Sequence, residues 1–248
     1  MRLLAEILAI VPRHLMQLVV GQKIRNLTDE QFITLLKDGH SLYRWGDGET
    51  AISRGKSISY QASNEVLRNK LNALLNSKDV RTINGLSWAV STSLFDKRWR
   101  SKKLFKVMFS TRVYLLGNHK FNADSNYVET QVWYHRRDIR NDLNHIVGKR
   151  PCLVIANTEE FLNAAPAHAE FLQCQSKNAF ESYHRLAGSI SEWIAENYDE
   201  LRPCILVACG PTSKAIVLDF RNRCQVIDVG HGFNFYLHGY GSYAWKTG

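Results

Sequence analysis

Two acidic residues separated by one glycine are the clearest candidates for chemistry in this sequence. Asp47 and Glu49 flank Gly48 and follow Gly46, directly after the apolar stretch at 41–45. In an extended segment, side chains two positions apart lie on one side, so both carboxylates could face one cation. The glycines allow a sharp turn and the close approach of a ligand. Two carboxylates with phosphate oxygens suit Mn²⁺ or Mg²⁺, although these residues also suit a simple polar turn.

Two further polar segments follow apolar stretches near the C-terminus. Gly210, Pro211 and Thr212 follow the apolar residues 205–209 and open a predicted helix, whose first free amides attract anions. His231 lies between two glycines after the apolar residues 224–229, so it could bind a metal or contact phosphate. Taken one at a time, these residues are better explained by an ordinary capped turn and a surface-loop histidine.

The pattern of apolar and polar residues along the chain predicts the strands and helices that would position these residues. Strands are expected at 41–45, 80–83, 112–116, 152–156, 171–174, 205–209 and 224–229. Helices are expected at 28–38, 63–76, 95–109, 124–147, 158–170, 179–198 and 212–221. This alternation predicts an α/β fold, a single doubly wound and mostly parallel sheet. Ligands in such folds bind beyond the carboxyl ends of the strands, where all three motifs lie.

The net charge, the cysteine spacing and the motifs that are missing limit the classes of function open to this sequence. The chain has 248 residues and a formal net charge of +9, a field that attracts nucleic acid, anionic membranes or phosphorylated substrates. None of its five cysteines forms a CxxC pair, which favours reduced thiols in a cytoplasmic protein. The sequence contains neither GxGxxG nor GxxxxGK[ST], so dinucleotide-binding and P-loop sites lose support.

Five stretches, taken in order, resemble one known family. They read SLYRWGDGE at 41–49, GKSISYQ at 55–61, SKNAFESYHRL at 176–186, ILVACGPTSKAIVLDF at 205–220 and QVIDVGHGFNFY at 225–236. Together they are similar to the GT-D-fold glycosyltransferases of bacterial surface-glycan and glycoprotein assembly. The resemblance implies a Rossmann-like GT-D domain over 26–248 and transfer of a hexose from a UDP-sugar to a glycan acceptor. It also implies that Asp47 and Glu49 bind the divalent metal and the nucleotide diphosphate.

Other site residues are assigned by their position around these motifs. Arg44, Gly46, Gly48, Lys177, Asn178, Gly210, Pro211 and Thr212 are expected to bind the nucleotide sugar, and His231 is expected to complete the metal site. Glu159 and Glu160 follow the strand at 152–156 and are candidates for the general base on the acceptor hydroxyl. Solvated acidic residues at the start of a helix would look the same. The residues 110–170 match the family poorly, so the resemblance does not identify the acceptor.

Two segments could contact a membrane. Residues 1–25 are expected to form an amphipathic helical extension, and the stretch 97–106 carries six cationic residues. Each suits either packing and solvation or contact with an anionic bilayer at the inner face of the plasma membrane. The acceptor could therefore be linked to a lipid pyrophosphate. The sequence is also compatible with a protein that forms an oligomer.

Two other functions compete with glycosyl transfer. A basic nucleic-acid-binding module would explain the charge, but not the glycines and acidic residues at strand ends, so no nucleic-acid partner is expected. A metal-dependent phosphohydrolase could use the same carboxylates and would release its product without an acceptor.

Overall fold

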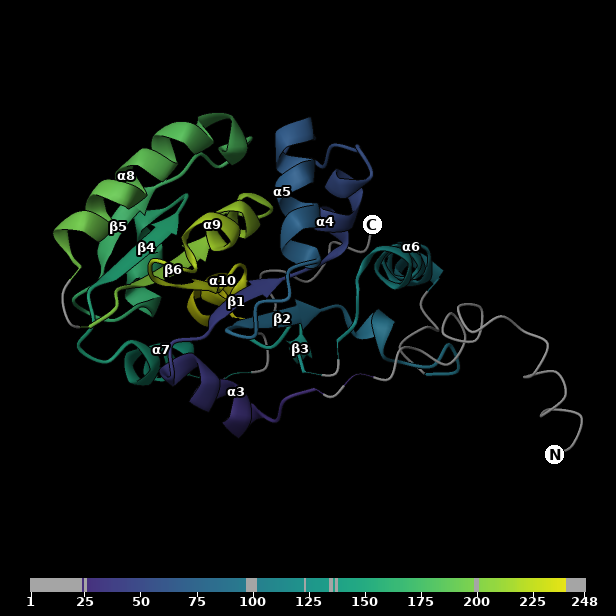
Figure 1. Cartoon of the computed structure of the whole chain (residues 1–248), viewed down its shortest axis with the longest axis horizontal. Helices are drawn as coiled ribbons and strands as arrows, with labels where there is room; N and C mark the ends of the chain where they lie inside the picture. The colour runs from purple at the N-terminus through teal and green to yellow at the C-terminus, as the bar shows by residue number, and fades with distance from the viewer. Residues whose placement is uncertain are drawn as a thin grey trace, which may run out of the picture.

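The computed structural model of the chain has three layers, with a parallel sheet between two layers of helices (Figure 1). It describes residues 24, 26–96, 102–122, 124–133, 136, 138–198 and 201–239. The strands are β1 (Ser41–Arg44), β2 (Thr82–Leu86), β3 (Asn126–Glu129), β4 (Cys152–Ala156), β5 (Glu170–Gln173), β6 (Cys204–Ala208) and β7 (Gln225–Asp228). They form one sheet in the order β3-β2-β1-β7-β6-β4-β5, and every pairing is parallel. The predicted doubly wound α/β fold is confirmed.

Helices cover both faces of this sheet. One face carries α4 (Asp47–Ser53), α5 (Glu65–Leu75), α6 (Lys102–Asn118), α8 (Tyr183–Glu196) and α9 (Thr212–Phe220). The other carries α3 (Asp29–Lys37), α7 (Ile139–Val147), α10 (Gly232–His238) and the 3-10 helix η3 (Glu159–Ala164). Two short 3-10 helices, η1 (Trp88–Val90) and η4 (Ala179–Ser182), precede α6 and α8.

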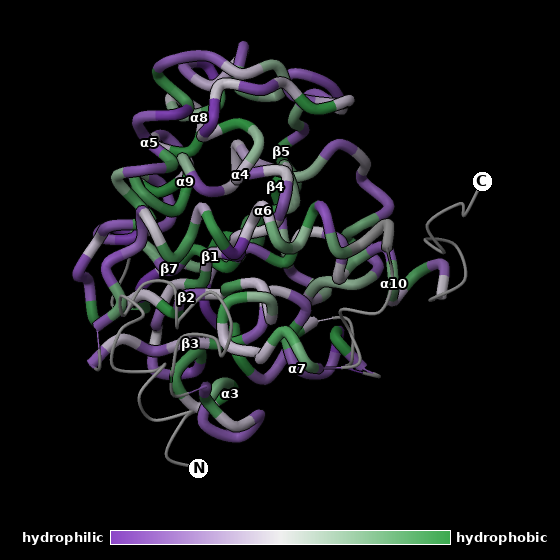
Figure 2. The backbone as a smooth tube through the Cα atoms, turned by 90° about the vertical axis from the view of Figure 1, so that its right-hand side faces the viewer, coloured by the Kyte–Doolittle hydropathy of each residue, from purple (hydrophilic) through white to green (hydrophobic). Residues whose placement is uncertain are grey.

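Each face of the sheet has its own apolar core. Leu153, Ile155 and Ile205 point to the α5–α9 side, whereas Val154 and Leu206 point to the α3–α7 side. Strands with apolar residues on both faces read as continuous apolar runs, which is why β4 and β6 were recognisable in the sequence. Figure 2 shows hydrophobic residues recurring along the strands, with hydrophilic residues on the outer turns of the helices.

Three predicted elements are wrong. The residues 112–116 lie inside α6, where buried residues at 111, 112, 114 and 115 follow a helical repeat rather than strict alternation. The predicted helix at 124–147 is instead the strand β3 followed by α7, because Tyr127 and Val128 pair with β2. The segment 158–170 forms only the single 3-10 helix η3, followed by β5.

The two predicted membrane-contact segments lie wholly or partly outside the described residues. The extension at 1–25 is outside apart from Ile24. Of the basic stretch 97–106, residues 97–101 are outside and residues 102–106 begin α6. Among the helices that the structure describes, none has the length and apolar character needed to cross a bilayer. The start of the described chain is held to the sheet, because the Leu27 amide donates to the Tyr127 carbonyl at 2.8 Å.

The direction in which the chain leaves each strand creates crevices at one edge of the sheet. After β1 the chain enters α4 on one face, and after the neighbouring β7 it enters α10 on the other. Open parallel sheets bind ligands where neighbouring strands lead to opposite faces. The crevice between the ends of β1 and β7 is therefore an expected position for a ligand site.

Candidate active site

The acidic motif begins a helix rather than continuing a strand. Gly46 is the N-cap of α4, Asp47 is its first residue and Glu49 its third. The Glu49 side chain folds back, and its Oε2 accepts a hydrogen bond from the Gly46 amide at 2.8 Å. Glu49 is thereby buried, at 7% exposed, whereas Asp47 is exposed. The prediction of two carboxylates side by side in an extended segment is wrong, since the helix separates their surroundings.

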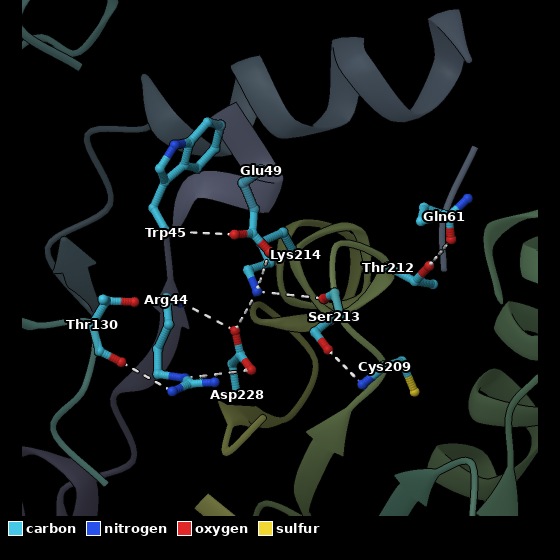
Figure 3. Close-up of polar contacts among 12 residues, drawn as sticks. Arg44, Trp45, Glu49, Gln61, Thr130, Cys209, Thr212, Ser213, Lys214 and Asp228 are labelled. Atoms are coloured by element: carbon cyan, nitrogen blue, oxygen red, sulfur yellow. Dashed lines mark hydrogen bonds and ion pairs between the residues drawn. The ribbon is translucent and has the colours of Figure 1, made fainter. Parts of the chain in front are cut away.

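Four charged residues meet where β1 and β7 end, and we call Arg44, Glu49, Lys214 and Asp228 the charged cluster (Figure 3). Lys214 Nζ lies 2.8 Å from Glu49 Oε1 and 2.9 Å from Asp228 Oδ2. Its third acceptor is the Gly210 carbonyl at 3.4 Å. With Lys214 only 3% exposed and Asp228 1% exposed, the ammonium uses its three protons inside the protein.

Arg44 joins the cluster to β7 and to the segment that follows β3. Its backbone amide donates to Asp228 Oδ2 at 3.2 Å, and its Nη1 donates to the Thr130 carbonyl beyond β3 at 2.9 Å. The guanidinium passes directly over Gly230, where an added Cβ would lie 1.7 Å from Arg44 Nη2. Gly230 has a φ of +50°, so both its backbone and its missing side chain suit glycine.

Three groups in the crevice have shifted pKa values. Burial alone would lower the pKa of Lys214, but Asp228 and Glu49 outweigh it and raise that pKa above its usual value. Asp47 and His231 are exposed residues, but the surrounding crevice keeps part of the water away from their titrating groups. This desolvation, followed by the nearby charge of Glu49, raises the pKa of the Asp47 carboxyl. Desolvation, followed by the cations Arg44 and Lys214, lowers the pKa of His231. His231 therefore lies beside the charged cluster, as an exposed and preferentially neutral imidazole.

The turn at Gly210 lies next to the cluster but is covered by a second segment. Gly210 has a φ of +57°, and an added Cβ would lie 2.8 Å from the Tyr60 ring. The hydroxyl of Thr212, a fully buried residue, donates to Gln61 Oε1 at 3.4 Å. Tyr60 also approaches Gly48, so this ring bridges the two glycine turns that the sequence singled out.

Lys177 and Asn178 lie at the far end of the same sheet edge. They follow β5, four strands away from β1, so Lys177 does not join Arg44. Asn178 adopts a left-handed conformation with a φ of 51°, and its Oδ1 accepts from the Ala62 amide at 2.8 Å. Its own amide donates to the Tyr60 carbonyl at 2.8 Å, so Asn178 anchors the segment that covers Gly210.

The candidate general bases lie in η3, after β4. Glu159 and Glu160 are both exposed, and Glu160 Oε2 lies 3.7 Å from His238 Nε2 in α10. That contact connects η3 to the helix that begins beside His231. In the described part of the chain, no group of three or more His, Cys, Asp or Glu side chains converges as a metal site.

Two members of the charged cluster were not foreseen as site residues. Asp228 is an acidic residue at the buried end of β7, directly after Val226 and Ile227, and Lys214 is a cation in the first turn of a largely buried helix. A single charge inside an apolar stretch is a usable signal, because such a residue is rarely buried unless it is paired. Tyr60 and Gln61 gave no such signal.

A model of the glycosyltransferase GT-D fold matches residues 87–240, which is more than half of the chain. The chain belongs to the GT-D-fold glycosyltransferase family. The matched segment contains Lys214, Asp228 and His231 of this GT-D enzyme, and begins after Asp47 and Glu49. No curated protein matches the sequence significantly.

Solved structures show the same fold. One is described as "The highly conserved domain of unknown function 1792 has a distinct glycosyltransferase fold"; it is 24% identical, with a TM-score of 0.65 over 86% of this chain and 81% of its own. Another, described as "A New Glycosyltransferase (DUF1792) from Streptococcus sanguinis", is 19% identical, with a TM-score of 0.64 over 86% and 85% of the two chains. At these identities the likeness supports the fold of the GT-D enzyme alone.

Proposed function

We propose that this glycosyltransferase moves a hexose from a UDP-sugar to a glycan acceptor, and that Asp47 holds a divalent cation on the donor diphosphate. The observation that carries the proposal is the charged cluster in the β1–β7 crevice, with an exposed carboxylate beside it. The crevice is the position at which open parallel sheets bind ligands. The family membership supplies the reaction class, and the resemblance of the sequence motifs favours UDP as the nucleotide.

The charges in the crevice explain why a cation would be needed. Arg44 and Lys214 balance Glu49 and Asp228, so the charged cluster is neutral and mutually paired. Asp47 adds a further negative charge at the surface. A diphosphate arriving there would meet net repulsion unless another cation came with it.

The residues fit a cation that the diphosphate shares. Mg²⁺ is commonly held by one or two carboxylates together with substrate phosphate oxygens, which does not require a preformed protein cage. Asp47 is the available carboxylate, because both Glu49 oxygens already have partners. His231 is the candidate nitrogen ligand, since its neutral form is favoured. When bound, Mn²⁺ or Mg²⁺ would stabilise the negative charge of the leaving diphosphate.

The protein's own residues have separate tasks in this proposal. Lys214 and the Gly46 amide fix Glu49, and Glu49 in turn fixes the start of α4, which carries Asp47. Arg44 and Asp228 hold the ends of β1 and β7 together beneath the diphosphate. The exposed Tyr60 offers a flat ring beside both glycine turns. Glu159 and Glu160 remain the candidates for taking the proton of the acceptor hydroxyl.

Two substitutions test the division of roles between the carboxylates. Asp47→Asn should lower transfer about a hundredfold or more while leaving the thermal midpoint unchanged, because Asp47 is exposed. Glu49→Gln should lower both the transfer rate and the thermal midpoint, because it leaves the buried Lys214 with one carboxylate partner fewer.

Donor and metal are tested by calorimetry on the same proteins. UDP should bind the native protein more tightly with Mn²⁺ than with EDTA, and Asp47→Asn should remove that difference. Equal UDP affinity with and without metal, or preference for another nucleotide, would refute the donor and metal assignments while leaving the family unaffected.

A further inference from the structure

A polar groove opens at the same edge of the sheet, beside β4 and β5. Its cavity volume is about 640 Å³, within the range of roughly 300–1,000 Å³ found for small-molecule sites. Its lining begins at Asn157, directly after β4, continues through the segment after β5, and ends on the first turns of α8. None of these residues belongs to the charged cluster.

The topology that makes the first crevice also makes this one. After β4 the chain enters η3 on one face, and after the adjacent β5 it enters η4 and α8 on the other. The two crevices lie three strand spacings apart along one edge, which corresponds to roughly 14 Å. A ligand in the groove would therefore face the same side of the molecule as a donor held near Asp47.

The lining has the chemistry of a carbohydrate site. Asn157, Gln173 and Gln175 each present a carboxamide, which both donates and accepts hydrogen bonds and so matches a sugar hydroxyl. Lys177 and Arg185 add further donors, and Glu181 adds an acceptor. Within the described part of the chain, these six side chains form no hydrogen bond or ion pair, and all six residues are exposed. Their polar groups are turned to solvent and ready to exchange water for hydroxyls.

The lining suits a nucleobase poorly. It contains no aromatic ring, whereas bases are commonly held by stacking on one. The exposed ring of Tyr60 instead lies over Gly210, near the charged cluster. The two sites thus differ in chemistry. The β1–β7 crevice has a flat aromatic surface nearby, whereas the groove beside β4 and β5 has clustered carboxamides.

The groove and the first crevice are physically joined. Asn178 lines the groove, and it bonds through both its amide and its side chain to the segment that carries Tyr60. Gln61 of that segment accepts from the Phe180 amide at 3.3 Å and from the Thr212 hydroxyl at 3.4 Å. The 58–62 segment therefore fixes one wall of the groove relative to the turn at Gly210.

We propose that this groove is the acceptor site, where carboxamides and cations at the ends of β4 and β5 bind the hydroxyls of the sugar that receives the transferred hexose. The proposal rests on the proposed function, since an acceptor presupposes a transfer reaction. It assigns Asn157, Gln175 and Arg185 to acceptor binding and leaves donor binding to the β1–β7 crevice.

The test uses substitutions in the full chain with matched controls elsewhere. Asn157→Ala/Gln175→Ala and Arg185→Ala alter the groove. Asn144→Ala and Arg140→Ala remove an exposed asparagine and an exposed arginine from α7, on the opposite face of the sheet from α8. The probes are UDP with Mn²⁺ in calorimetry, and p-nitrophenyl glycosides of several hexoses in saturation-transfer NMR and in transfer assays. Thermal midpoints of all variants are recorded, and these exposed positions should leave them unchanged.

Expected results separate the two sites. Groove variants should weaken glycoside binding and raise the acceptor KM about tenfold or more, while UDP affinity changes less than twofold and the controls behave as native protein. Weaker UDP binding in the groove variants would overturn the proposal, because the groove would then belong to the donor. Unchanged glycoside binding in the variants, or no glycoside binding by the native protein at millimolar concentration, would also overturn it. A native protein that binds glycosides in the groove but not UDP would instead refute the donor assignment alone.

Discussion

Lys214 is the residue on which the charged cluster depends. Without its ammonium, Glu49 and Asp228 would be two buried carboxylates near one another, with only Arg44 to offset them. Breaking a buried ion pair from one side is costly because the remaining charge stays out of water. The lysine therefore stabilises the folded chain and positions the helix that carries Asp47.

We expect Lys214→Met to lower the free energy of unfolding by roughly 3–5 kcal/mol. Asp228→Asn should also destabilise, but adding it to Lys214→Met should cost less than the sum of the single changes, by about 0.5–3 kcal/mol, because one of the two stranded carboxylates is then neutral. Urea unfolding of the two single variants and the double variant measures this coupling. Strict additivity would show that the lysine and the aspartate do not interact.

The sequence allowed part of this site to be predicted. Asp47, the Gly210 turn and His231 each follow a predicted strand, and the parallel sheet gathers them at one edge as expected. The partners of Glu49 could not be read from the sequence, because they depend on Lys214 reaching across from α9. Nothing local to residues 46–49 indicates that Glu49 has a buried partner.

At the scale of elements, the turn between β7 and α10 is shaped by Arg44. Gly230→Ala would place a Cβ against the guanidinium, which is itself held by the Thr130 carbonyl. Gly148 also has a positive φ, of +61°, with a ψ of −128° and open space around its Cβ position, so Gly148→Ala is a control for backbone strain away from the crevice. We expect both substitutions to lower the free energy of unfolding in urea, and only Gly230→Ala to lower transfer activity, because its Cβ would displace the Arg44 guanidinium. Native transfer activity in Gly230→Ala would mean that Arg44 moves aside freely.

The junction between α6 and β3 should make stability depend on pH. His119 is buried after the end of α6, next to Phe121 and Tyr127, and burial lowers its pKa below the usual 6.5. The unfolded chain therefore binds the proton more readily, so stability falls as pH drops below the unfolded value. His119→Gln should reduce the loss of stability between pH 7 and pH 5 relative to native protein, as measured by urea unfolding at each pH. An unchanged slope would show that His119 is protonated equally in both states.

The same junction explains which elements could be predicted. Residues 112–116 read Arg-Val-Tyr-Leu-Leu, and their apolar run with Val113 and Tyr114 suits a strand, yet buried Arg112 donates to the Ala89 carbonyl at 3.0 Å from within α6. Tertiary contacts of this kind outweigh the local preference for a strand, and they cannot be recognised from the sequence alone. By contrast, the capping residues Thr28 and Gln31 predicted the start of α3 correctly, because both of their hydrogen bonds are local.

For the whole molecule, the formal charge of +9 bears on where the enzyme would meet its acceptor. A positively charged protein is drawn to anionic lipid, and the attraction weakens within a short screening length as salt rises. The described sheet begins with the contact of Leu27 with β3, and residues 1–20 precede it in the chain. Deleting residues 1–20 therefore tests what this segment contributes to membrane recruitment.

We expect vesicles that contain anionic lipid to recruit the full chain, with recruitment falling as salt rises. Deleting residues 1–20 should weaken recruitment while leaving UDP affinity near that of the native protein, because the charged cluster of the β1–β7 crevice is formed by Arg44, Glu49, Lys214 and Asp228. Co-sedimentation with vesicles at two salt concentrations measures recruitment, and neutral vesicles serve as the control. If the full and truncated chains partition equally, the basic surface of the folded domain is sufficient for binding and the N-terminal segment has no membrane role. If neither chain binds anionic vesicles, the positive charge serves the phosphorylated donor alone, and a membrane-linked acceptor loses its support.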